Sequence, residues 1–241
     1  MSQLLKTAGF ILRAVPFQDD DLILTAFTAK LGKVALFARG ARRAKSPFGP
    51  EIDLLSESEF IVFNAKNIRP LREATLRHYF PRLKANYDGL NAAMYGTRLL
   101  SQLVHEGQRD ENNLRLFSRF LHALDQEDVP VALYELAYKL RLLDNFGVAP
   151  HLDGCVRCGK SGQQVWFSLG RGGLICPACH APGDLALQAG LAQGLNALRT
   201  MAWDKLGRLH LSARDLAAGA ELLEKFMVYH VRGNQAKKVV V

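Results

Sequence analysis

Residues 19–46 read DDDLILTAFTAKLGKVALFARGARRAKS, a run that begins acidic, continues apolar and ends basic. Residues 22–28 and 33–39 are short runs rich in apolar and β-branched side chains, and Gly32 lies between them. Runs of this kind, bounded by glycine or by acidic turns, are typical of β-strands. The stretch therefore predicts two neighbouring strands, with a basic segment directly after the second.

The same pattern extends across the first 80 residues. Three more runs are predicted as strands, at 8–15, 58–63 and 71–76, and turn residues such as Pro16 and Pro70 separate them. Five short strands in sequence predict a small closed or partly open barrel. An SH3-like barrel fits the spacing nearly as well, and the strand pattern alone leaves this alternative open.

Beyond Pro81 the apolar residues recur three and four positions apart, which is the period of an amphipathic helix. Asp110 supplies a start and Gly147 a stop. The sequence thus predicts an α+β chain of several domains. Its expected divisions are a barrel over 1–80, a helical part over 81–150, an inserted module over 151–185, and a second helical part with a loose tail over 186–241.

All four cysteines lie within the inserted module, as two C-x-x-C pairs with 17 residues between them. The pairs are Cys155 with Cys158 and Cys176 with Cys179. Two C-x-x-C pairs at this separation are typical of a tetrahedral zinc site, and Gly159 permits the tight turn that brings two sulfurs to one point. Four thiolates leave no open coordination position, so we expect one structural Zn²⁺ ion in a zinc ribbon.

Two alternatives to this metal site were weighed. A disulfide pair would suit a secreted protein, but the first residues lack the continuous apolar region of a signal peptide. His180 is a conceivable replacement for one cysteine ligand. With no run of 18 apolar residues, the sequence predicts a cytoplasmic protein that does not span a membrane.

The charge is concentrated near the third predicted strand. The chain has a net charge of +8, and six basic residues but no acidic one lie between Lys30 and Lys45. Glycine, serine and proline surround the later ones, which predicts a surface loop. Arginine side chains can pair with phosphate oxygens or stack on bases, so the loop is a candidate for nucleic-acid binding. A solvated basic loop is the plain alternative.

Two phenylalanines, Phe37 and Phe48, flank this basic loop. They are either platforms on which bases stack or ordinary core residues, and the second interpretation is favoured. Charge alone does not choose among nucleic acid, acidic membranes and acidic protein tails as the partner.

The sequence contains no set of residues that indicates catalysis. His105–Glu106 is followed by Arg109, where a metalloprotease motif requires histidine. The carboxylates of Asp19–Asp21 are a candidate metal site for a nuclease, although a solvated turn explains them more simply. We therefore predict a protein that is not an enzyme.

Taken together, these features resemble the RecO family of bacterial recombination mediators and DNA repair proteins. The resemblance rests on residues 19–46, with their acidic turn, Gly-Lys turn and Gly-Ala-Arg-Arg-x-x-Ser loop, and on the C-x-x-C … C-x-x-C segment. The order of barrel, helices, ribbon and helices also agrees with the family.

The resemblance implies an N-terminal OB-fold and binding of single- and double-stranded DNA. It further implies annealing of complementary strands and help in loading RecA onto DNA coated by single-strand-binding protein, in the nucleoid-associated part of the cytoplasm. Expected partners are RecR and the acidic C-terminal tail of single-strand-binding protein, with RecF as a further candidate. The DNA contacts expected on this basis are Lys33, Arg39, Arg42, Arg43 and Lys45.

The position of the pocket for the acidic tail is not given by any motif. Basic residues on the apolar-rich helices were considered for it, namely Arg115, Arg119, Lys139 and Arg141. The alternative to a DNA-binding mediator is a zinc-ribbon scaffold that recruits acidic protein tails without binding DNA directly.

Overall fold

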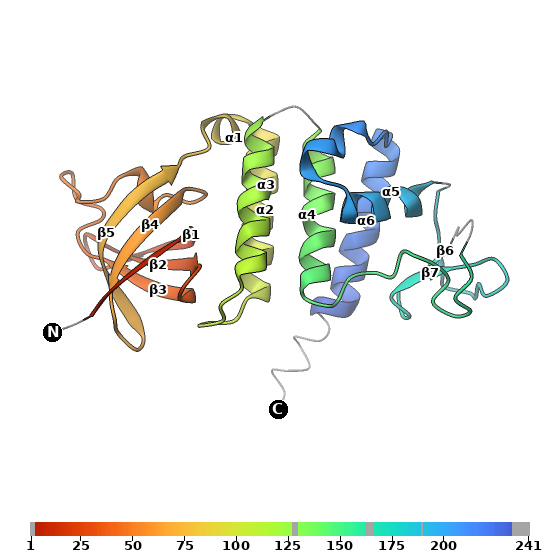
Figure 1. The fold of residues 1–241 in the computed structure, drawn as a ribbon, viewed down its shortest axis with the longest axis horizontal. Helices are drawn as coiled ribbons and strands as arrows, with labels where there is room; N and C mark the ends of the chain where they lie inside the picture. Colours follow the sequence, from red (N-terminus) through yellow and green to blue (C-terminus); the bar gives the residue numbers. More distant parts are fainter. Residues whose placement is uncertain (1–2, 127–129, 162–165, 189, 233–241) are drawn as a thin grey trace. The chain divides into compact units, whose positions relative to one another are not determined.

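The computed structural model describes residues 3–126, 130–161, 166–188 and 190–232 (Figure 1). The chain divides into two compact units, Met1–Glu127 and Asp128–Val241, which are described separately below. The boundary between the units falls inside the predicted helical part 81–150, and the division into four parts stays a prediction. The predicted tail at 237–241 lies outside the described residues.

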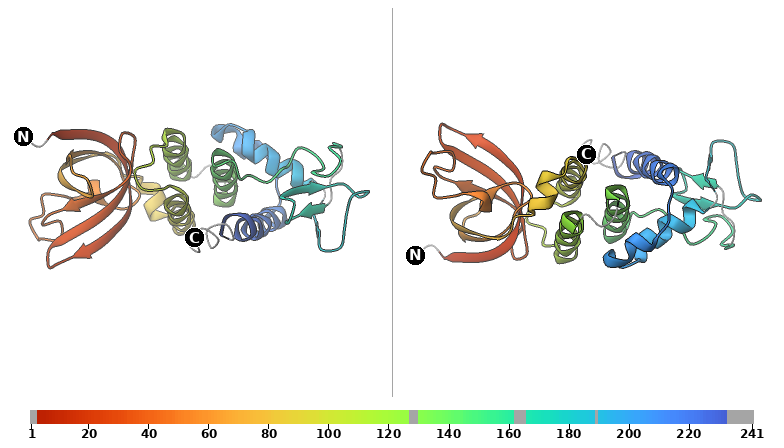
Figure 2. Two further views of the ribbon diagram at one scale, coloured as in Figure 1. Left: turned by 90° about the horizontal axis from the view of Figure 1, so that it is seen from below. Right: turned by 90° about the horizontal axis from the view of Figure 1, so that it is seen from above.

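The first unit begins with a closed five-stranded barrel (Figures 1 and 2). Its strands are β1 (Leu4–Phe17), β2 (Asp21–Thr28), β3 (Gly32–Ala38), β4 (Glu57–Phe63) and β5 (Ile68–His78). They close in the order β1-β2-β3-β5-β4, with β3 and β5 parallel and the other pairs antiparallel. This is the strand order of an OB-fold, so the predicted fold class is confirmed and the SH3-like alternative is wrong.

Alternation of side chains along the strands fills the barrel. Leu24, Leu36 and Phe60 lie in one buried cluster inside it, while their neighbours along each strand face outward. The connection from β3 to β4 includes the short helix η1 (Pro50–Ile52), and Ile52 of that helix joins the same cluster. The interior of the barrel is therefore a packed core rather than a channel.

Three helices follow the barrel in the first unit: α1 (Pro81–Ala85), α2 (Tyr87–Leu103) and α3 (Glu111–Gln126). The side chain of Asn86 accepts the Gly89 N–H at 2.7 Å and so begins α2. Asp110 accepts the Asn113 N–H at 3.0 Å at the start of α3, as its position in the sequence predicted. The ring of Phe117 on α3 meets Phe10 of β1 edge to face, at 5.1 Å between centroids.

The second unit is built on α4 (Val131–Asn145), α5 (Leu191–Thr200) and α6 (Ala213–Met227). The 3-10 helix η2 (Trp203–Arg208) joins α5 to α6, and a π-helical turn η3 (Val228–Arg232) continues α6. Ser212 and Asp215 form a reciprocal capping box that begins α6. The helical pattern read from the sequence is thus confirmed in all three of these helices.

Between α4 and α5 lies a small three-stranded sheet with the order β7-β6-β8. Its strands are β6 (Trp166–Ser168), β7 (Gly173–Ile175) and β8 (Leu185–Ala186). The sequence predicts strands at 164–168 and 173–175, and β6 and β7 confirm them over the described residues, which exclude 164 and 165. Strand β8 was not predicted, because two residues are too few to show a period.

None of the helices in the described part of the chain combines the length and the apolar character needed to cross a membrane.

Candidate DNA interface and candidate metal centre

The basic loop, defined here as residues 39–49, leaves the end of β3 and runs over the barrel. Its predicted DNA contacts Arg39, Arg42, Arg43 and Lys45 are all exposed. Gly40, in contrast, is buried and has a φ of +67°, a left-handed conformation that glycine adopts without strain. The structure therefore brings four cationic side chains together on one surface loop.

The acidic residues before β2 hold this loop in position. The Asp21 carboxylate accepts the Gly40 N–H at 2.7 Å. Asp20 accepts the Arg42 N–H through its carbonyl at 2.8 Å, and its carboxylate accepts Arg43 Nε at 3.0 Å. Because both partners of the Arg43–Asp20 ion pair are exposed to solvent, it contributes roughly 0.2–1 kcal/mol. Arg43 can therefore exchange this carboxylate for a phosphate at small cost.

These contacts also bear on the metal-dependent nuclease considered for Asp19–Asp21. Two of the three carboxylates bind the basic loop. Over the described residues, the sole group of three or more potential ligands close enough to share a metal ion consists of the four cysteines. The acidic turn thus shapes the loop that follows β3, and nothing in its geometry favours a metal site.

Arg39 and Lys45 carry the least compensated charges of the basic loop. Across the part of the chain that the structure describes, neither makes an ion pair or a side-chain hydrogen bond, whereas Arg42 donates to the Asp19 carbonyl at 3.2 Å. The guanidinium of Arg39 and the ammonium of Lys45 are accordingly the most available to a polyanion.

Lys33, the fifth predicted DNA contact, has partners inside the first unit. Its Nζ donates to the Ser101 carbonyl at 2.5 Å and to the Val104 carbonyl at 3.1 Å, at the end of α2. Burial lowers the pKa of Lys33, and the nearby Glu106 partly opposes this. A cation at a helix C-terminus satisfies carbonyls that lack a partner within the helix. Lys33 therefore joins barrel to helix, and we do not carry it into the proposal below.

The two phenylalanines beside the basic loop face different sides of the barrel wall. Phe48 packs against the barrel core and lines a cavity of about 620 Å³ at the barrel mouth. Phe37 alternates with the buried Leu36 and so faces outward. Its ring lies 6.0 Å from that of Phe17, at an interplanar angle of 85°. Phe17 could not be predicted from the sequence, because only the pairing of β1 with β2 brings it next to Phe37.

Two of the helical cations considered for an acidic protein tail are bound within the second unit. Lys139 is buried, and its Nζ lies 2.7 Å from Glu135 and 3.0 Å from Glu224. Arg141 donates to the Leu198 carbonyl at 2.9 Å, at the end of α5. Both side chains thus stabilise the packing of helices, and we do not propose them as contacts for a partner.

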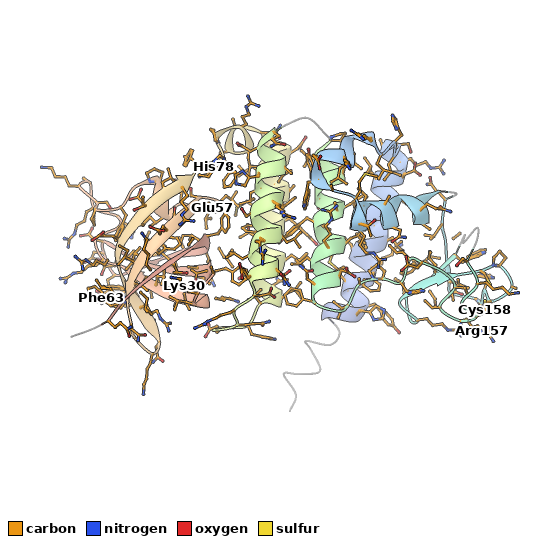
Figure 3. All side chains as sticks on the ribbon, viewed as in Figure 1. Lys30, Glu57, Phe63, His78, Arg157 and Cys158 are labelled. Atoms are coloured by element: carbon orange, nitrogen blue, oxygen red, sulfur yellow. The ribbon has the colours of Figure 1, made fainter. Side chains whose placement is uncertain are left out.

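The four cysteines of the second unit converge on one point. Their Sγ atoms all lie within 4.8 Å of one another, and those of Cys158 and Cys176 are 3.7 Å apart. With Zn–S bonds of about 2.3 Å, a tetrahedral site places its sulfurs about 3.8 Å apart. The cluster can therefore hold a metal ion, and its dimensions and ligand type suit zinc. Figure 3 labels one of the four, Cys158.

Two backbone turns present the sulfurs. The Gly159 N–H donates to the Cys155 carbonyl at 2.8 Å, and Gly159 has the positive φ of +73° that the sequence analysis expected of a tight turn. The second pair is held by a tighter turn, in which the Cys179 N–H donates to the Cys176 carbonyl at 2.9 Å. Each C-x-x-C pair is thus folded for chelation by its own local hydrogen bonds.

The thiols of the cluster differ in acidity. Burial opposes ionisation of Cys155, but N–H groups of the backbone, first that of Cys176, donate to its sulfur and lower its pKa to about 6. Hydrogen bonding to the Cys176 side chain raises the pKa of Cys179 to about 12. A bound divalent ion stabilises the thiolate form of its cysteine ligands.

His180 lies beside this cluster without belonging to it. Its ring packs on Trp166 at 3.8 Å between centroids, with a tilt of 31°. The group of ligand atoms that lie close together comprises cysteines, so the geometry gives no support to His180 as a replacement ligand. Trp166 in turn packs against Cys155 and Cys176, which shields that side of the cluster.

Comparison with known families gives two matches that together cover most of the chain. A model described as "Recombination protein O N terminal" matches residues 1–80, and one described as "Recombination protein O C terminal" matches residues 85–238.

Curated relatives carry a consistent name. The DNA repair protein RecO of Desulfatibacillum aliphaticivorans is 31% identical, over 97% of this chain and 94% of its own length. The DNA repair protein RecO of Alkaliphilus metalliredigens is 34% identical, over 77% of this chain and 76% of its own length. That of Anaeromyxobacter dehalogenans is 31% identical, over 94% of this chain and 91% of its own length.

Proposed function

Because the chain belongs to the RecO family, whose curated relatives are named DNA repair proteins, we propose that it acts as a recombination mediator that binds DNA directly. It carries out no bond-making chemistry in this proposal. It holds single- and double-stranded DNA, anneals complementary strands, and helps RecA to assemble on strands coated by single-strand-binding protein.

The observation that supports DNA binding most strongly is the basic loop. Its four exposed cations are held away from the barrel core by the acidic turn, and those of Arg39 and Lys45 are uncompensated. Cations on an exposed loop release counterions from a phosphate backbone, which favours binding whatever the base sequence. Annealing needs such surface, because two polyanions repel each other until their charge is reduced.

The metal centre has a structural role in this proposal. Cys155, Cys158, Cys176 and Cys179 bind one Zn²⁺ ion and so hold the two turns of the ribbon together. Four thiolates occupy the coordination sphere, which leaves no position for water or substrate. RecR, RecF and the acidic tail of single-strand-binding protein remain proposed partners, and their contact surfaces are not assigned to residues here.

The proposal is tested by measuring how the affinity for a DNA strand of uniform sequence, such as oligo-dT, depends on salt concentration. Each phosphate contact on a single strand contributes about 0.7 to the slope of log affinity against log salt. The double variant Arg39→Ala/Lys45→Ala should therefore flatten this slope by about 1.4. Duplex binding should weaken as well, because phosphate contacts do not require unpaired bases.

Arg115→Ala is the matched control. Arg115 is exposed like the loop cations, but it lies on α3 and is 3.5 Å from Glu111. Its loss should leave the slope unchanged. If the loop variant also left affinity and slope unchanged, the loop would be a solvated surface and the proposal would be wrong. If the wild type were not retained on single-stranded DNA at moderate salt, the scaffold that recruits acidic protein tails would replace it.

A further inference from the structure

Three strands of the barrel share one outer face, which their register defines. Phe10, Phe27 and Lys33 are paired across β1, β2 and β3, and Val15, Ile23 and Phe37 form a second row across the same strands. Paired residues in an antiparallel sheet lie on the same side. Since Leu24 and Leu36 face the barrel interior, both rows face outward.

The first row is covered by helices of the same unit. Phe27 has no exposed surface, the ring of Phe10 contacts Phe117 on α3, and Lys33 donates to carbonyls at the end of α2. We call this part of the outer face the covered half. Its aromatic side chains are explained completely by packing.

The second row is less covered, with Ile23 and Phe37 half-buried, and we call it the open half. Val15 is 36% exposed and Phe17, which is paired with Asp21 beside this row, is 41% exposed. Ile68 extends the patch onto β5, where it is paired with Ala35 and is 43% exposed. An apolar patch of this kind on a folded surface is typical of a binding site.

Two exposed cations border the open half, and the acidic turn Asp19–Asp21 follows Phe17. Arg13 is paired with Thr25, so it faces outward beside Val15, and it is exposed. Arg39 follows the end of β3, two residues beyond Phe37, and is exposed as well. The acidic side chain within the patch, Asp21, is engaged with the Gly40 N–H. The patch is thus apolar and aromatic at its centre and has Arg13 and Arg39 at its rim, with the exposed Asp19 beyond Phe17.

We propose that the open half binds unpaired bases of single-stranded DNA, which stack on Phe17 and Phe37 while Arg13 and Arg39 contact the phosphates. This inference rests on the proposed function, and it adds a surface that discriminates single strands from duplex. The occupant must offer flat apolar groups and negative charge together, and an unpaired nucleic-acid strand offers both along its whole length. The rings of Phe17 and Phe37 stand nearly perpendicular, so they can serve two successive bases that are not stacked on each other.

The basic loop and the open half differ in what they require of DNA. The loop contacts phosphates, which single strands and duplexes both expose. The open half needs the faces of bases, which a duplex conceals in its own stack. A strand bound here is held with its bases splayed, while the cations of the loop remain available to a second strand. Such an arrangement would serve the annealing of two strands.

The experiment compares Phe17→Ala, Phe37→Ala and the double variant in the full-length chain, with an oligo-dT strand and a duplex of equal length as probes. Stacking contributes about 1–3 kcal/mol for each base, so each single variant should bind the single strand about 5- to 150-fold more weakly. Duplex affinity should change less than twofold. The salt slope should stay as in the wild type, because stacking releases no counterions.

Two control variants accompany these. Leu4→Ala removes an exposed apolar side chain of similar exposure at the other end of β1, and it should leave single-strand affinity unchanged. Phe17→Tyr keeps an aromatic ring and should retain most of the affinity that Phe17→Ala loses. Fluorescence of 2-aminopurine in the single strand provides a readout of stacking itself, and its change on binding should disappear in the double variant.

The outcomes separate this inference from the proposed function. Unchanged single-strand affinity in the double phenylalanine variant would overturn the inference, and so would equal losses on single strand and duplex. The proposed function would stand in either case if the Arg39→Ala/Lys45→Ala variant still flattened the salt slope. Loss of lipid binding or of self-association in the phenylalanine variants, with DNA affinity intact, would likewise overturn it in favour of another occupant.

Discussion

The covered half and the open half of the outer barrel face are made from the same three strands and from similar side chains. Phe27 and Lys33 in the covered half correspond to Phe37 and Arg39 at the open half. Phe27 has no exposed surface and Lys33 donates to carbonyls at the end of α2, whereas Phe37 is half-buried and Arg39 is exposed. Whether a phenylalanine or a cation of this face has a structural role therefore depends on what packs on it. Those that nothing covers are available to a partner.

The two halves also differ in how much their side chains contribute to the stability of the barrel. Side chains of the covered half are buried, so their removal leaves cavities or unpaired polar groups. Those of the open half are partly solvated already, and their loss costs little folding energy. Substitutions in the covered half should accordingly lower stability, and substitutions in the open half should lower DNA affinity.

The largest effect is expected in the metal centre, and it tests whether DNA binding is confined to the barrel. Structural zinc supplies roughly 10–16 kcal/mol to the folding of isolated finger peptides. Cys176→Ser should therefore abolish zinc binding and raise amide hydrogen exchange in residues 151–161 and 166–186. Affinity for single-stranded DNA should persist, because the barrel has a core of its own. Loss of DNA affinity with unchanged exchange in the barrel strands would place the DNA surface in the second unit.

A smaller effect separates the two halves by stability. Phe27→Ala should lower the free energy of unfolding of the barrel by about 3–5 kcal/mol, because it removes a fully buried ring and leaves a cavity. Phe37→Ala should lower it by about 1 kcal/mol or less, since the side chain is partly exposed. Urea unfolding of both variants, followed by a probe in the barrel, measures the difference. Equal destabilisation would mean that the open half is as well packed as the covered half.

The cations provide the third and smallest contrast. Lys33→Met removes two hydrogen bonds to carbonyls at the end of α2 and should cost about 1–3 kcal/mol of stability. It should leave the salt slope of single-strand binding as in the wild type. Arg39→Ala should do the reverse, with stability retained and the slope flattened by about 0.7. A flattened slope in the Lys33 variant would return Lys33 to the DNA surface and would blur the distinction between the halves.

Much of the architecture could be predicted because its signals are local. The five strands follow from short apolar runs between turns, the helices from their period, and the clustered cysteines from the spacing within and between two pairs. The basic loop is likewise a continuous stretch of sequence. Each of these features depends on residues that are close neighbours along the chain.

The features that could not be predicted depend on pairing over long distances. Lys33 meets carbonyls 68 and 71 positions further along the chain, and nothing near Lys33 announces them. Phe17 reaches Phe37 only through the register of β1 on β2, which shifts between Ile11 and Arg13. Without that shift, Arg13 and Val15 would face the barrel interior, because a displacement of one residue turns every later side chain to the other side. The local sequence does not show the shift.

The central claim, that the open half of the outer barrel face binds single-stranded DNA, is tested most directly by photocrosslinking. An oligo-dT strand carrying 5-iododeoxyuridine would be irradiated with the full-length chain, and the crosslinked peptides identified by mass spectrometry. Iodouracil couples to aromatic rings on which it stacks. The account therefore predicts crosslinks of the single strand at Phe17 and Phe37, and no crosslinks to a duplex, even when the duplex is in excess. Crosslinks confined to the second unit, or to aromatic residues away from this face such as Tyr87, would contradict it.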